Sequence, residues 1–320
     1  MSKATFNKKV FIVSCHASLE YDQILMFRGL GYRVAGNFDT GNAQRPHVPG
    51  CDVSYPVDVG AQESDVVVLH QVPNYPVVFD DLCGKRAWNQ PVILVNFGQG
   101  DMNTHGAVAR ILKVHPNAWL VNYSRTDMNR MIALGAPGER MRMIRFGKLL
   151  EEYEGWIGDV CSVYVSGNSI HRRGLGCGWD KLVWLIKHSG FPIILSGKET
   201  EEVGGIGELT YGGLRSMYKH MRCFVSFGTT PAPYVLTLME AMCTGCPVIA
   251  WDNGCGIANE ELSVILVKSR DELINNIRLL LHNDEIAHVV SERMYEVSRT
   301  EFDMVTVGQQ WDKFIEEAMA

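Results

Sequence analysis

The sequence predicts an α/β protein built from two Rossmann-like domains, each a doubly wound parallel sheet, that face each other across a cleft. Short runs of consecutive apolar residues recur along the chain, as the buried strands of parallel sheets do. Segments with the helical spacing of apolar residues separate these runs, and strands that alternate with helices form parallel sheets. At roughly 150 residues per domain, the 320 residues are enough for two domains.

The first half of the chain alternates strand and helix patterns from its beginning. We expect strands at residues 9–14, 32–35, 65–69, 91–95, 118–123 and 140–144. A helix follows the first strand and ends between Gly29 and Gly31. Another helix is predicted over residues 124–134, because Ser124 can cap its start and Gly135 can end it.

The second half repeats the pattern after a boundary at residues 146–158, which are acidic, flanked by glycines and without a clear period. We expect strands at residues 162–165, 192–196, 223–227, 247–250 and 264–267, and helices at 179–188, 213–219, 235–244 and 270–282, before a helical tail. The predicted organisation is a first domain over residues 1–148, a second over 149–300 and a C-terminal helix over 301–320.

The composition is that of an ordinary globular protein, with 46% apolar and 21% charged residues. The net charge of −6 argues against a protein whose whole surface serves nucleic acid or an anionic membrane. No apolar run reaches the length of about 18 residues that suggests a membrane span. The first residues lack the apolar core of a signal peptide, and the nine cysteines are scattered through apolar segments. We therefore expect a cytoplasmic protein without integral membrane association.

The segment over residues 224–250 carries the strongest functional signal. It reads as a strand, a loop rich in Thr and Pro, a helix, a glycine turn and a second strand. The helix starts near Tyr234 or Val235, and its free backbone N–H groups and positive dipole end form an anion site. Glu240 follows one to two turns later, where a carboxylate can accept hydrogen bonds from a ribose diol.

This segment resembles the donor-site signature of the retaining glycosyltransferase family four. The matching residues are Leu-Thr-Leu-Met-Glu-Ala-Met at 236–242 and Gly-Cys-Pro-Val-Ile at 245–249. Weaker similarity extends along the whole chain, for example at residues 140–147 and 164–167. The resemblance implies the GT-B architecture, with an acceptor domain first, a donor domain second, and a last helix that crosses back to the first domain.

The resemblance also implies roles for individual residues. Glu240 would hold the ribose, Arg173 would neutralise the diphosphate, and the base would lie near Tyr211. The full set expected to bind the donor is Ser14, Gly167, Asn168, Arg172, Arg173, Tyr211, Gly212, Thr230, Tyr234, Val235, Leu236 and Glu240. One position departs from the family pattern, because Ala232 stands where a first motif glutamate contacts the donor sugar, so we expect an unusual donor or a divergent subfamily.

The implied reaction moves a sugar from a nucleotide-sugar donor, UDP- or GDP-linked, to a hydroxyl acceptor with retention of the anomeric configuration. Electrostatic stabilisation of the leaving diphosphate would supply most of the rate enhancement. Arg173, His70 and His16 are the catalytic candidates, although a structural role for His70 is equally open. No Asp-x-Asp motif is present, so we expect no required metal and no cofactor beyond the donor. For His105, capping of a helix or exposure to solvent is the favoured interpretation.

Other functions stay open. Arginines and a lysine outnumber acidic residues over 125–148, which indicates either a solvated face or a patch for an anionic acceptor, such as modified DNA. If the segment binds an anionic acceptor, the alternative function is that of a phage-type enzyme that glycosylates a modified DNA base. A non-catalytic nucleotide-binding relative is suggested by Ala232, and a third possibility is another two-Rossmann enzyme, such as an epimerase or a phosphorylase-like protein.

Overall fold

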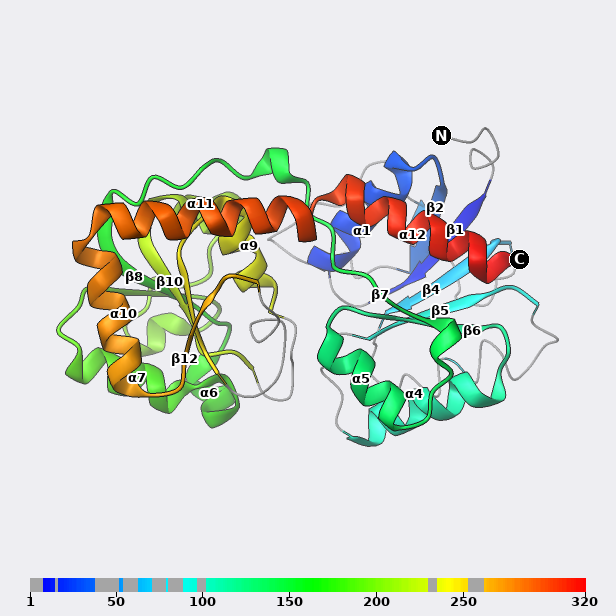
Figure 1. Ribbon diagram of the computed structural model, residues 1–320, viewed down its shortest axis with the longest axis horizontal. Helices are drawn as coiled ribbons and strands as arrows, with labels where there is room; N and C mark the ends of the chain where they lie inside the picture. The colour runs from blue at the N-terminus through cyan, green and yellow to red at the C-terminus, as the bar shows by residue number, and fades with distance from the viewer. Residues whose placement is uncertain are drawn as a thin grey trace. The chain divides into compact units, whose positions relative to one another are not determined.

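The computed structural model describes residues 8–14, 17–37, 52–53, 63–70, 79, 89–96, 102–229, 235–252 and 262–320. The chain divides into two compact units. Unit 1 comprises Met1–Lys148 and Met304–Ala320, and unit 2 comprises Leu149–Asp303. Each unit contains one parallel β-sheet with helices packed against it (Figure 1), which confirms the predicted class of two doubly wound sheets.

The sheet of unit 1 has seven strands in the order β3-β2-β1-β4-β5-β6-β7. The strands are β1 (Lys9–Val13), β2 (Arg33–Asn37), β3 (Asp52–Val53), β4 (Val66–His70), β5 (Val92–Asn96), β6 (Ala118–Asn122) and β7 (Met141–Met143). The chain first builds outward from β1 through β2 and then crosses to β4 on the other side of β1. This reversal is a topological switch point, and ligands of such sheets bind outside the carboxyl ends of the strands that flank it.

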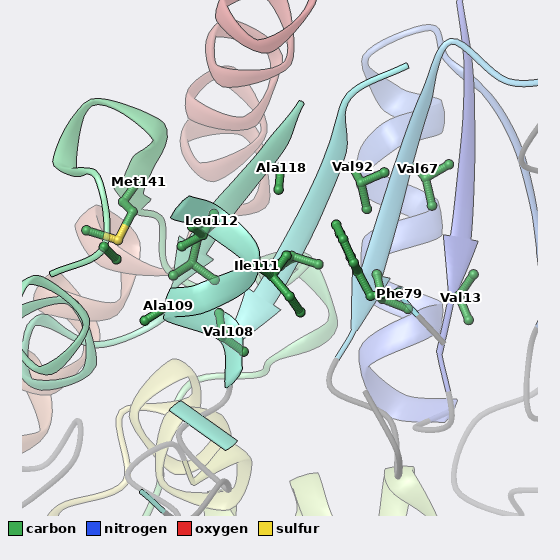
Figure 2. Packing of buried hydrophobic residues seen from close by; sticks show 14 of the residues in the cluster. Val13, Val67, Phe79, Val92, Val108, Ala109, Ile111, Leu112, Ala118 and Met141 are labelled. Atoms are coloured by element: carbon green, nitrogen blue, oxygen red, sulfur yellow. The ribbon is translucent and has the colours of Figure 1, made fainter. Parts of the chain in front are cut away.

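The helices of unit 1 are α1 (Ala17–Gly29), α4 (Met102–Val114), α5 (Arg125–Ala133) and α12 (Met304–Met319). The core lies between the strands and α4, where Val67 and Val92 of the sheet meet Ile111 and Leu112 of the helix (Figure 2). Fully burying one such side chain contributes about 1.5–3 kcal/mol. Helix α4 is not among the helices predicted from the sequence, because its first turns are polar and contain Gly106.

The sheet of unit 2 has five strands in the order β12-β11-β10-β8-β9. They are β8 (Val160–Ser166), β9 (Ile193–Ser196), β10 (Met221–Ser226), β11 (Val248–Trp251) and β12 (Ile265–Val267). Its helices are α6 (Ile170–Arg173), α7 (Trp179–His188), α8 (Tyr211–His220), α9 (Leu236–Thr244), α10 (Arg270–His282) and α11 (Asp284–Glu301). The strand order reverses between β8 and β10, so this neighbouring pair flanks the switch point of unit 2.

The helical tail consists of two helices. Helix α11 ends at Glu301 in unit 2, and α12 begins at Met304 in unit 1. Within unit 1, α12 runs beside α1 (Figure 1), where the rings of Phe27 and Trp311 meet edge to face at 5.5 Å. None of the described helices has both the length and the apolar composition of a membrane span.

Candidate functional site

Several of the predicted donor-binding residues of unit 2 follow the two strands that flank its switch point. Gly167 and Asn168 directly follow β8, and the short helix α6, which ends at Arg173, comes next. Helix α9, with Glu240 in its second turn, follows the loop after β10. Because β8 and β10 are parallel neighbours, these segments start from the same edge of the sheet. That edge is where an open α/β sheet binds its ligands.

The loop after β8 is interlocked with the loop after β9. The Gly167 amide donates to the Ser196 carbonyl at 2.9 Å, and the Ser169 amide donates to the Lys198 carbonyl at 2.8 Å. In the other direction, the Lys198 amide donates to Asn168 Oδ1 at 3.0 Å. The side-chain oxygen of Asn168 therefore already has a structural partner, and the loop presents a backbone held by its neighbour.

The two adjacent arginines of α6 differ in their surroundings. Arg172 forms ion pairs with two carboxylates, to Glu199 Oε1 at 3.2 Å and to Glu202 Oε1 at 2.7 Å. The exposed side chain of Arg173 forms no ion pair or hydrogen bond with any residue that the structure describes. Arg173 therefore has its donors available for an anionic ligand, whereas those of Arg172 are engaged.

Glu240 is a buried carboxylate on a helix that starts at the site. Only 5% of Glu240 is exposed, so its side chain is buried within unit 2. Burial, and to a smaller extent the negative charge of Glu240, raises the pKa of Tyr164 in β8 to about 12. The carboxylate thus lies close enough to Tyr164 of β8 to act on its pKa. The helix begins at Leu236, and its cap residue Val235 supplies no side-chain hydrogen bond to the first amides.

The start of α8, where the base is expected, is partly engaged by other side chains. The hydroxyl of Tyr211 lies within hydrogen-bonding distance of the Tyr153 hydroxyl, and the guanidinium of Arg215 lies 4.7 Å from the centre of its ring. Thr210 caps the helix by accepting a hydrogen bond from the Gly213 amide at 3.2 Å. Gly212 is exposed, with open space around it. The backbone at Gly212 is therefore the part of this turn that is open to a planar ligand.

In unit 1, His70 is fully buried at the end of β4, beside the switch point. Its Nδ1 atom lies 3.3 Å from Ser14 Oγ, and its Nε2 atom lies within hydrogen-bonding distance of Gln23 Oε1. Because an amide oxygen only accepts, Nε2 carries the proton and Nδ1 accepts from the Ser14 hydroxyl. Both ring nitrogens are therefore engaged, which favours the structural role that the sequence left open over that of a general base.

The basic segment over residues 125–148 is not a free cationic patch. Arg140 donates to three backbone carbonyls, including that of His115, and Arg142 pairs with Glu317 at 2.6 Å. Arg145 is buried and donates to the Tyr123 carbonyl at 3.0 Å, and Lys148 forms a buried ion pair with Asp22. Most of these charges hold unit 1 together, which removes the main sequence argument for a nucleic-acid surface.

The prediction for His105 is wrong. His105 lies inside α4, is 2% exposed, and has its Nε2 atom 3.7 Å from Asp127 Oδ1. The prediction failed because α4 was not predicted, so that His105 was assigned to a polar loop.

Several expected site residues cannot be placed. His16, Thr230 and Tyr234 lie outside the described residues, as does Ala232. Within the described ranges, no group of three His, Cys, Asp or Glu side chains is arranged to hold a metal ion. Glu199 and Glu202 were not predicted as site residues, because glutamates outside a recognisable motif carry no signal in the sequence until their partners are known.

No protein-family model matches the chain, and no curated protein matches it in sequence. Solved structures match the fold. HepE of Anabaena, solved with UDP and glucose, has a TM-score of 0.75 at 12% identity, covering 97% of this chain and 100% of its own.

Two further structures match over nearly their whole length. A glycosyltransferase of Rickettsia africae has a TM-score of 0.70 at 12% identity, covering 98% of this chain and 99% of its own. The DNA-modifying β-glucosyltransferase, solved in the presence and absence of uridine diphosphoglucose, has a TM-score of 0.61 at 11% identity, covering 96% and 99%. The chain is therefore similar in fold, over both units, to structures of glycosyltransferases.

Proposed function

We propose that this protein is a glycosyltransferase that moves a sugar from a nucleotide-sugar donor to a hydroxyl acceptor. The observation that carries the proposal is that an available cation, Arg173, and a buried carboxylate, Glu240, lie in the segments that follow the paired strands β8 and β10. A cation suits a diphosphate and a carboxylate suits a ribose diol. The structural similarity to HepE, which was solved with UDP and with UDP-glucose, supports the same ligand class.

The reaction needs little covalent chemistry from the protein. The bond between the anomeric carbon and the donor phosphate oxygen breaks, the acceptor oxygen bonds to that carbon, and the leaving diphosphate takes the acceptor's proton. Arg173 and the first amides of α9 would stabilise the charge that develops on the diphosphate. Removing one donor of this kind typically costs about 10²–10³ in rate.

The proposal also includes the stereochemistry of the reaction, the donor, the metal requirement and the location of the protein. We infer retention of the anomeric configuration, a UDP- or GDP-linked hexose or pentose, no required metal, and a cytoplasmic location. Unit 2 would bind the donor through residues that include Gly167, Gly212 and Leu236, and unit 1 would bind the acceptor. The configuration of the product, read by NMR, tests retention, and activity in the presence of a chelator tests the metal.

The experiment that tests the function is a thermal-shift panel of UDP, GDP and nucleotide sugars. A ligand at 100 times its Kd stabilises the folded state by about 2.7 kcal/mol, a shift that is readily measured. We expect at least one nucleoside diphosphate to raise Tm, and Glu240→Ala to abolish that rise. Glu301→Ala, an exchange outside the site at the end of α11, is the matched control. If no nucleotide stabilises the protein, the proposal is wrong.

Assays on the same purified protein distinguish the alternative functions. A protein that binds the nucleotide but transfers and hydrolyses no sugar is a non-catalytic relative. Transfer of labelled sugar to DNA that carries a hydroxylated base would identify the DNA-modifying alternative. The fold similarity to β-glucosyltransferase is weak support for it, because Arg140 and Arg142 of the basic segment are engaged within unit 1.

A further inference from the structure

The loops after β8 and β9 contain two strained residues that contact each other. Among the described residues, the non-glycine positions with positive φ are Ser169 at 48°, Glu199 at 63° and Ser263 at 65°. Such left-handed conformations are unfavourable for residues with a side chain and persist where the surroundings impose them, often at functional sites. Ser169 lies two residues after Gly167, and Glu199 lies two residues after Gly197, so both belong to the edge that carries the candidate site.

The carboxylate of Glu199 connects the two loops through both of its oxygens. The Ser169 hydroxyl donates to Oε2 at 2.7 Å, and Arg172 Nη1 donates to Oε1 at 3.2 Å. Both contacts depend on the left-handed backbone at Glu199, because that backbone sets where its side chain begins. The strained backbone at Glu199 therefore allows two contacts, one with Ser169 and one with Arg172 of α6.

The contacts of Glu199 separate Arg172 from Arg173. On a helix, consecutive residues do not face each other, so a turn that directs Arg172 toward Glu199 directs Arg173 to a different side. Arg172 also pairs with Glu202, which His171 contacts from the same turn at 3.1 Å. The hydrogen bond from Arg172, and to a smaller extent that from His171, holds the pKa of Glu202 below its usual range. This acidic pair would repel a diphosphate if it were left without partners.

We propose that Glu199 is a positioning residue of the donor site, whose carboxylate holds Ser169 and Arg172 so that Arg173 is the arginine that meets the diphosphate. The inference rests on the proposed function and adds a specific residue to it. Glu199 acts through α6, since the contacts described above are to protein groups. The strained backbone at residue 199 is maintained for this contact and not for the stability of the fold.

The test is a substitution that separates strain from function. Glu199→Gly relieves the strain, because glycine adopts positive φ without penalty, but it removes the carboxylate. We expect the Tm of the free protein to be unchanged or raised, while the Kd for UDP or GDP, whichever stabilises the wild type, rises by roughly tenfold in isothermal titration. A residue with only a structural role would not shift stability and affinity in opposite directions.

Matched variants complete the experiment. Ser263→Gly relieves the same kind of strain just before β12, at the amino edge of the sheet, and should leave nucleotide affinity unchanged. Glu199→Gln keeps an acceptor for Ser169 and should recover part of the affinity. In an Arg173→Ala background, Glu199→Gly should weaken binding no further, because its effect passes through Arg173. Should Glu199→Gly fail to fold, Glu199→Asn also tolerates the left-handed backbone and replaces it.

The outcomes distinguish this inference from the proposed function. If neither UDP nor GDP binds the wild type, the proposed function fails first. If a nucleotide binds, Arg173→Ala weakens it and Glu199→Gly does not, the role of Glu199 is wrong while the donor site stands. Additive effects of the two substitutions would also overturn the inference, because they would show that Glu199 acts independently of Arg173.

Discussion

At the scale of single residues, Gly197 leaves no room for a side chain. Its φ is +134°, and a Cβ atom added to it would lie 2.5 Å from the Gly167 carbonyl oxygen. This close approach allows the loop after β9 to run against the loop after β8. The geometry of the candidate site therefore depends on a glycine that makes no contact with a ligand itself.

We expect Gly197→Ala to destabilise the protein by about 2–4 kcal/mol, because it adds a backbone clash to a strained conformation. Urea denaturation of the purified variant measures this change. Gly155→Ala, also in unit 2 but with open space around the added atom, serves as the control and should change stability by roughly 0.5 kcal/mol or less. Equal stability of the two variants would show that the loops can separate at little cost.

At the scale of elements, helix starts follow the side chains that the sequence places there. Ser124 caps α5 by accepting from the Asp127 amide at 3.1 Å, and its hydroxyl donates to Asp127 Oδ2 at 2.6 Å. Ser269 caps α10 in the same way through the Glu272 amide at 3.2 Å, but on the surface. The two caps use one local pattern in a buried and an exposed setting.

Ser124→Ala should therefore cost about 2 kcal/mol, at the upper end for a cap, because it also removes the hydroxyl that donates to the buried Oδ2 atom of Asp127. Ser269→Ala should cost about 0.5–1 kcal/mol, because water can replace the lost hydroxyl. Thermal unfolding of both variants gives the comparison. A larger loss at Ser269 than at Ser124 would contradict this assignment of the buried network.

At the scale of the whole molecule, the chain leaves and re-enters unit 1 at neighbouring residues. Lys148 is the last residue before unit 2, Met304 is the first after it, and the Met304 amide donates to the Lys148 carbonyl at 3.0 Å. The side chain of Lys148 forms a fully buried ion pair with Asp22 of α1 at 2.8 Å. One buried pair thus anchors both connections between the units to the body of unit 1.

Lys148→Met should destabilise unit 1 by about 3–5 kcal/mol, because it leaves the charge of Asp22 buried without its partner. The double variant Asp22→Leu with Lys148→Met removes both charges and should cost less than the single change. Glu63→Gln, which breaks an exposed pair with Lys9, should cost about 1 kcal/mol or less. Chemical denaturation followed by circular dichroism checks all three, and a double variant no more stable than Lys148→Met would argue against the buried pair.

The class of fold and most of the strands and helices can be predicted from the sequence. A buried parallel strand can be predicted from local composition, because both of its faces are covered and its residues are apolar, as at positions 66–69 and 92–95. The helix that carries Glu240 was also visible, since an apolar segment between a Thr/Pro-rich loop and a glycine turn has few other conformations. Helix α4 was not predicted, because its polar first turn obscures the helical spacing of the apolar residues that follow.

Which charged and polar groups form hydrogen bonds or ion pairs, in contrast, is seen only in the folded structure. Arg172 and Arg173 are neighbours in sequence, yet Glu199, 27 residues away, pairs with one and not with the other. His70 meets Gln23 across 47 residues, and Lys148 meets Asp22 across 126. Such pairs carry no local pattern, because the separation between partners is set by the order of the strands. Hydrophobic burial can therefore be predicted from the local sequence. The chemistry available at a site depends on contacts that form only after the chain has folded.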